Sequence, residues 1–155
     1  HLVIELAGHP IRVSGEITGY KKLDLDVDIC SDLMLKHKTG AVSQIHLDYL
    51  QQPSHRSGLV TFEKAWLGYD FNKMEITGQR INEEPQMLWN NSNYDSNQMY
   101  VDQLEEFIRF VEEGRVKHQY DAISSVESLK VVDAFFKSNK TGKKVDIKQN
   151  KRFSF

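Results

Sequence analysis

Two side chains near the middle of the chain, those of His46 and Asp48, can exchange protons or bind a metal ion. They lie two positions apart in a segment that is predicted to be a strand, so both side chains share one face of it. That geometry suits an acid–base pair or two ligands of one metal ion. A metal site usually has three or more protein ligands, and no third ligand is visible in the sequence. The favoured interpretation is a polar pair on an open sheet face or in an oligomer interface, and no metal site is predicted.

A second group of candidate residues lies in loops. His55 and Arg56 follow Pro53, and Tyr94 precedes a predicted helix. Loops on a rigid sheet often carry ligand contacts, and the planar guanidinium group of arginine matches phosphate or carboxylate. A tyrosine hydroxyl can hydrogen-bond a hydroxyl group of a ligand. We therefore name His55, Arg56 and Tyr94 as candidate substrate-binding residues; a solvated loop without a ligand is the simpler alternative.

The composition limits the possible partners. The 155 residues are 39% hydrophobic and carry a net charge of -2, which suits one globular domain. The charges are interspersed, whereas nucleic-acid binding needs a basic patch, so no nucleic-acid partner is expected. No apolar run approaches the roughly 18 residues of a membrane span. The single cysteine, Cys30, cannot form an intramolecular disulfide; it is predicted to be a small buried residue, and the protein to be cytoplasmic.

Hydrophobic periodicity and turn residues divide the chain into short elements. Gly40 supplies the positive φ that a tight hairpin needs between two of the strands. Asp121 is predicted to cap the last helix, and Gly114 to end the helix before it. Strands are predicted over residues 11–19, 29–38, 41–50, 59–62, 65–71, 73–77, 86–89 and 145–147, and helices over residues 1–7, 97–113 and 121–138.

This order of elements predicts the fold class. Sequential strands joined by short turns pair antiparallel, and strands followed by helices indicate an α+β domain. We predict an open, predominantly antiparallel β-sheet with two long helices packed on one face. The other face is then wet or covered by a partner. The apolar stripes of the two helices are Val101, Leu104, Phe107, Ile108 and Val111 in the first, and Ile123, Val126, Leu129, Val132, Phe135 and Phe136 in the second.

Residues 122–147, AISSVESLKVVDAFFKSNKTGKKVDI, resemble the C-terminal signature of the Gfo/Idh/MocA family of NAD(P)-dependent sugar dehydrogenases. Three further segments are similar to phrases of this family and occur in the same order: ELAGHP at residues 5–10, LMLKHKTGA at 33–41 and HLDYLQQP at 46–53. The resemblance covers nearly the whole chain. It departs from the family at Gln52, where arginine is usual.

The resemblance implies that residues 1–155 form a single C-terminal substrate-binding and oligomerisation domain. The N-terminal Rossmann domain would then be missing, and the initial His in place of Met suggests a piece of a longer chain. The family would use NAD or NADP in the full-length protein, whereas this fragment, which has no G-x-G-x-x-G motif, should bind neither and be inactive alone. The implied partners are a sugar or nucleotide-sugar substrate, the chain's own Rossmann domain, and further copies in a homo-oligomer through the open sheet face.

The family's catalytic histidine lies on the first helix of this domain. Spacing from Gly8 places that position about three residues before the chain begins, and a slip in register makes His1 a weak candidate. A frayed terminal residue is the alternative. The competing function is a non-catalytic ligand-binding or scaffold domain of the same fold. A Gly-rich nucleotide-binding motif upstream of His1 would favour the enzyme over the non-catalytic domain.

Overall fold

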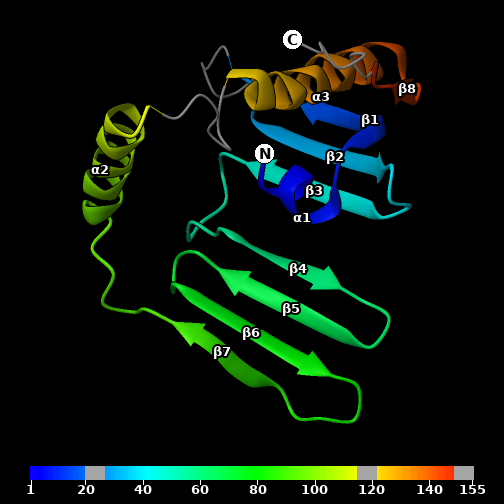
Figure 1. Ribbon diagram of the computed structural model, residues 1–155. Helices are drawn as coiled ribbons and strands as arrows, with labels where there is room; N and C mark the ends of the chain where they lie inside the picture. The colour runs from blue at the N-terminus through cyan, green and yellow to red at the C-terminus, as the bar shows by residue number, and fades with distance from the viewer. Residues whose placement is uncertain (20–26, 115–121, 149–155) are drawn as a thin grey trace. The chain divides into compact units, whose positions relative to one another are not determined.

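The computed structural model describes residues 1–19, 27–114 and 122–148 and has an α+β fold (Figure 1). The predicted class and the antiparallel pairing are confirmed, but the strands form two four-stranded sheets instead of one. The chain divides into two compact units, one formed by His1–Leu50 with Lys117–Phe155 and the other by Gln51–Val116. Asp121, the predicted helix cap, lies outside the described residues.

The sheet of the first unit is built around a strand pair. Its order is β3-β2-β1-β8, with every described neighbour antiparallel. Side chains of β2 alternate between buried and exposed along its whole length, which is the period of a strand with one covered face. The strands are β1 (Pro10–Thr18), β2 (Cys30–His37), β3 (Val42–Asp48) and β8 (Val145–Asp146).

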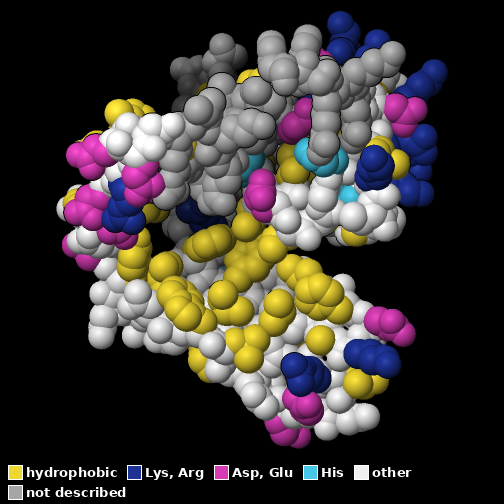
Figure 2. Space-filling view, in the orientation of Figure 1, with side chains coloured by type: hydrophobic (Ala, Val, Ile, Leu, Met, Phe, Trp, Pro, Cys, Tyr) yellow, Lys and Arg dark blue, Asp and Glu magenta, His cyan; other side chains and the backbone are white. Residues whose placement is uncertain are grey.

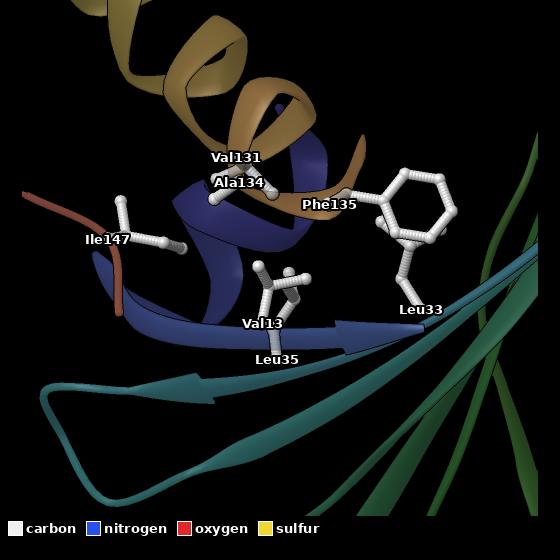
Figure 3. Close-up of a cluster of buried hydrophobic side chains, with 7 residues drawn as sticks. All are labelled: Val13, Leu33, Leu35, Val131, Ala134, Phe135 and Ile147. Atoms are coloured by element: carbon white, nitrogen blue, oxygen red, sulfur yellow. The ribbon is translucent and has the colours of Figure 1, made fainter. Parts of the chain in front are cut away.

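Helix α3 (Ala122–Thr141) covers one face of this sheet (Figure 1). Its buried side chains meet those of β1 and β2 in one hydrophobic cluster (Figure 3). Gly15 lies under Phe135, and a Cβ at this position would come within 2.8 Å of the ring. The members of the cluster are Val13, Leu33, Leu35, Val131, Ala134, Phe135 and Ile147.

The buried stripe of α3 differs from the predicted one. Phe135 is buried as expected, but Val126, Leu129, Val132 and Phe136 are exposed, and Val131 and Ala134 are buried instead. Ser138 partly explains why this stripe of α3 faces the sheet. Its buried hydroxyl donates to the carbonyl of Lys143 at 2.7 Å and accepts the N–H of Gly15 at 3.3 Å. A helix with apolar residues on several sides faces the sheet with the stripe that also satisfies its polar contacts.

A short helix, α1 (Leu2–Ala7), is tied to the β2–β3 hairpin. Gly8 ends this helix with φ 82°, and its carbonyl lies 2.6 Å from Nδ1 of the fully buried His37. Nε2 of His37 lies 2.8 Å from the Ser43 hydroxyl, so both ring nitrogens have partners. Gly40 has φ 93°, which confirms the predicted hairpin.

The sheet of the second unit is a meander in the order β4-β5-β6-β7. It does not continue the first sheet, because residues 51–56 after β3 form an irregular segment that includes Pro53 and begins no strand pairing. Hydrophobic side chains gather over this sheet in Figure 2. The strands are β4 (Ser57–Thr61), β5 (Ala65–Asp70), β6 (Glu75–Arg80) and β7 (Gln86–Asn90).

Helix α2 (Gln98–Glu112) has no buried residue. The whole apolar stripe predicted to pack on a sheet, from Val101 to Val111, is exposed, with Phe107 62% accessible. The prediction that both long helices cover a sheet face therefore holds for α3 and is wrong for α2. No helix among the described residues combines the length and the apolar composition that a bilayer span requires.

Two phenylalanines test this difference. Phe135→Ala should lower the free energy of unfolding by about 3–5 kcal/mol, because it leaves a cavity between α3 and β1. Phe107→Ala should change it by less than about 1 kcal/mol, because the ring is already exposed. Urea denaturation of both variants measures the difference; equal losses would contradict the observed packing.

Candidate functional site

The densest group of reactive side chains in the described residues lies on the exposed face of the first sheet. Cys30 and Asp32 come from β2, and His46 and Asp48 come from β3. Strand register pairs Asp32 with His46 and Cys30 with Asp48. Because their strand neighbours Ser31 and Leu33 are buried, alternation turns Cys30 and Asp32 to the other face. The prediction that Cys30 is buried is therefore wrong; it is half-buried on the open face.

Three of the four residues, Cys30, Asp32 and His46, lie close together. Nδ1 of His46 lies 2.8 Å from Oδ1 of Asp32. The thiol of Cys30 lies 3.8 Å from Oδ2 of Asp32 and 4.0 Å from Nδ1 of His46. Asp48 lies on the other side of the ring, with its Oδ2 3.9 Å from Nε2 of His46. The imidazole is thus held between two carboxylates.

The two carboxylates change the pKa values of His46 and Cys30. The hydrogen bond that the His46 ring donates to Asp32 raises the pKa of His46, and the charges of Asp32 and Asp48 act in the same direction. Desolvation raises the pKa of the Cys30 thiol, and the two carboxylates raise it further. Without a bound cation, the cluster therefore favours an imidazolium ion and a neutral thiol.

Sequence reasoning found half of this cluster. It identified His46 and Asp48 but missed Asp32 and Cys30, which lie far away along the chain. A signal was present: Asp32 and His46 are equidistant from Thr39, and so are Cys30 and Asp48. Folding the sequence about the predicted turn at Gly40 would have placed them opposite each other. A thiol, an imidazole and two carboxylates can exchange protons or ligate a metal ion.

The three predicted substrate-binding residues lie in the second unit. Nε2 of His55 is 2.5 Å from the Ser57 hydroxyl, and the guanidinium carbon of Arg56 is 4.8 Å from the centre of the Phe71 ring. The Arg56 carbonyl also accepts the N–H of Phe71 at 2.9 Å. The cation–π contact holds the guanidinium near the ring while leaving Arg56 exposed.

Tyr94 follows β7 at the same end of the sheet, where its N–H donates to the carbonyl of Asn91 at 3.0 Å. Strands β4 and β7 are three strand spacings apart, about 14 Å, so Tyr94 and Arg56 lie near opposite edges. The structure brings His55 and Arg56 together and does not bring Tyr94 to them.

A shallow apolar depression of about 650 Å³ lies at the other end of this sheet. Leu59, Phe62, Trp66 and Ile81 line it, and the Trp66 indole N–H donates to Oε1 of Gln79 at 2.9 Å. Arg80 provides a charged group at its wall. None of the predicted substrate-binding residues lines this depression.

His1 is the weak catalytic candidate, and both of its ring nitrogens have neighbours. Nδ1 lies 3.2 Å from the Ser128 hydroxyl on α3, and Nε2 lies 3.5 Å from Oε1 of Glu5. These contacts hold the ring at the start of α1. The contacts with Ser128 and Glu5 position the His1 ring away from the Cys30–Asp32–His46 cluster.

The Asp32–His46 pair predicts a pH effect. Asp32→Asn should lower the pKa of His46 toward its ordinary value, because the hydrogen bond that the ring donates to the carboxylate is the largest cause of the raised pKa. Since the folded pKa is raised above the unfolded one, the pair's stabilisation is fully present below the unfolded pKa. It is lost as pH rises through the folded pKa.

NMR titration of the His46 ring protons measures this shift. Asp133→Asn is the matched control, because Asp133 pairs with Lys137 on α3 and lies outside the cluster. An unchanged His46 pKa in Asp32→Asn would show that the pair does not persist in solution.

No family model and no curated protein matches the chain. Levoglucosan dehydrogenase in complex with NADH and levoglucosan matches 96% of this chain and 48% of its own, with a TM-score of 0.85 and 13% identity. The aldose-aldose oxidoreductase from Caulobacter crescentus, complexed with glycerol, matches 93% and 43%, with a TM-score of 0.78 and 16% identity.

An oxidoreductase domain protein from Kribbella flavida matches 96% of this chain and 47% of its own, with a TM-score of 0.83 and 13% identity. This chain therefore spans about half the length of the structures it resembles. At such identities the likeness shows the fold, and it agrees with the resemblance that the sequence motifs indicated. The chain has the fold of one half of these oxidoreductases.

Proposed function

We propose that this chain is the substrate-binding and subunit-contact domain of an NAD(P)-dependent oxidoreductase acting on a sugar or nucleotide sugar. The observation that carries the proposal is the match of 96% of the chain to half of levoglucosan dehydrogenase, a structure that contains NADH and levoglucosan. A second complex of that enzyme contains L-sorbose. The motifs in residues 33–41, 46–53 and 122–147 support the same family independently of the structural match.

We infer that the enzyme's Rossmann-type dinucleotide site lies outside the described residues. Such a site needs parallel strands joined by a helix, with a Gly-rich turn at the helix start. Both described sheets pair antiparallel throughout. We therefore place the NAD(P) site on a Rossmann domain outside this chain; a bound nicotinamide would supply or accept a hydride there.

For this chain, the proposed role is to bind and orient the substrate. The guanidinium of Arg56, held over the Phe71 ring, offers donors that match a phosphate or carboxylate group. His55 lies beside it with its ring against Ser57. Tyr94, near the opposite edge of the same sheet, can contact a different part of an extended substrate such as a nucleotide sugar.

Subunit contact is proposed for the exposed face of the β3-β2-β1-β8 sheet. α3 covers the opposite face, so this face is the one left to solvent or to a partner. It exposes the large apolar side chains of Met34 and Val42 among polar ones. A mixed surface of this kind is common in protein interfaces, and a homo-oligomer would bury it.

Nucleotide titration tests the domain assignment. Isothermal titration with NADH and NADPH should show no binding by the 155-residue chain and binding by the product of the complete reading frame. Binding by the chain itself would overturn the assignment. Absence of binding by both would instead favour a non-catalytic ligand-binding domain.

Arg56 tests the substrate role. In the product of the complete reading frame, Arg56→Ala should raise KM for a phosphate-bearing sugar roughly 10- to 100-fold with little change in kcat, because a charged hydrogen bond contributes about 1.5–3 kcal/mol. Lys73→Ala is the matched control, since Lys73 is an exposed cation at the same end of the sheet that pairs with Asp70. Equal KM values for the two variants would remove Arg56 from the substrate site.

A further inference from the structure

We propose that Cys30, Asp32 and His46 bind a single transition-metal ion, of which Zn²⁺ fits best, on the exposed face of the first sheet. The Cys30 thiolate, a carboxylate oxygen of Asp32 and Nδ1 of His46 are the ligands. Asp48 orients His46 from its other nitrogen, and a water completes the coordination. This inference does not depend on the proposed dehydrogenase function.

Convergence of three different donors carries the proposal. The Cys30, Asp32 and His46 ligand atoms all lie within 4.8 Å of one another. They come from the paired strands β2 and β3, whose hydrogen-bonded register fixes the positions of their Cα atoms. Donors placed on a sheet lose less freedom on binding an ion than donors on a loop.

The distances suit a tetrahedral ion after small side-chain rotations. With Zn–N near 2.0–2.1 Å and Zn–S near 2.3 Å, ligand atoms around zinc are about 3.3–3.6 Å apart. The thiol is 3.8 Å from an Asp32 oxygen and 4.0 Å from Nδ1, slightly too far. Nδ1 lies 2.8 Å from the other Asp32 oxygen, Oδ1, which is slightly too close because these two atoms are hydrogen-bonded to each other. A metal ion in place of the proton between Nδ1 and the Asp32 carboxylate would move these two groups apart. It would also draw the Cys30 thiol closer to both.

Asp48 is placed as the supporting residue. A histidine that binds metal through one nitrogen commonly donates the N–H of the other to a carboxylate. Oδ2 of Asp48 lies 3.9 Å from Nε2, on the side of the ring away from Asp32 and Cys30. Its other oxygen accepts the N–H of Leu50 at 2.6 Å, which fixes the carboxylate.

Local charge also favours a cation. Glu16 on β1 is directly opposite Asp32 on the same face, and like charges at opposite positions destabilise a strand pair. Asp48 adds a third carboxylate opposite Cys30. A divalent ion would offset this repulsion and would favour the thiolate form of Cys30.

The donor set selects the ion. A thiolate with an imidazole suits zinc and its neighbours among the transition metals, whereas magnesium and calcium prefer all-oxygen sites. Three protein ligands and a water leave one open position, as in zinc sites that bind a further small ligand. The proposed site is therefore a three-ligand zinc site with one open coordination position.

Zinc titration of the metal-free 155-residue chain tests the proposal. Isothermal titration and metal analysis after dialysis should give one Zn²⁺ per chain. Cys30→Ser, Asp32→Asn and His46→Gln should each weaken binding at least ~10-fold. His9→Gln is the matched control: His9 is an exposed histidine of the same unit, 3.8 Å from Glu127, and its loss should not change the affinity.

Cobalt gives an independent readout. Co²⁺ bound to the wild-type chain should show a thiolate-to-metal charge-transfer absorption that Cys30→Ser lacks, while circular dichroism shows the variant still folded. No stoichiometric zinc binding would overturn the proposal. Zinc affinity equal in wild type, Cys30→Ser and His46→Gln would also overturn it, because the ion would then lie elsewhere.

Discussion

The packing of α3 on the β1–β2 pair decides which face of the first sheet is buried. Phe135 and Val131 lie against Val13, Leu33 and Leu35, and Gly15 gives the Phe135 ring room to approach the backbone. Because side chains alternate along a strand, a shift of one residue in β2 would exchange its two faces. The position of Cys30 and Asp32 on the open face, and so the whole reactive cluster, depends on this packing.

A buried histidine, His37, holds the β2–β3 hairpin at the end next to its turn. His37 joins the end of α1 to β3 through Gly8 and Ser43, with both ring nitrogens satisfied. A buried ring with both nitrogens bonded fixes its neighbours' positions. The two histidines of this hairpin thus differ in role: His37 supports the register inside the core, and His46, half-exposed, lies among the donors that the register aligns.

The second unit exposes many large apolar side chains. Hydrophobic side chains gather on its surface (Figure 2). Leu59, Leu88 and Trp89 are exposed, and β7 has no buried residue. The apolar stripe of α2 is exposed in the same way. Apolar area on this scale usually marks contact with further protein. It agrees with a chain that spans about half the length of the oxidoreductases it resembles.

Local sequence signals determined the class of the fold, most of its strands, the Gly40 turn and the likeness to one half of an oxidoreductase. These features depend on neighbours in sequence: alternation, turn residues and helix ends. Three things were decided only by the tertiary structure. They are the separation into two sheets, the stripe of α3 that is buried, and the meeting of Cys30 and Asp32 with His46. Each depends on partners distant in the chain, and periodicity within one element cannot tell which of its faces another element will cover.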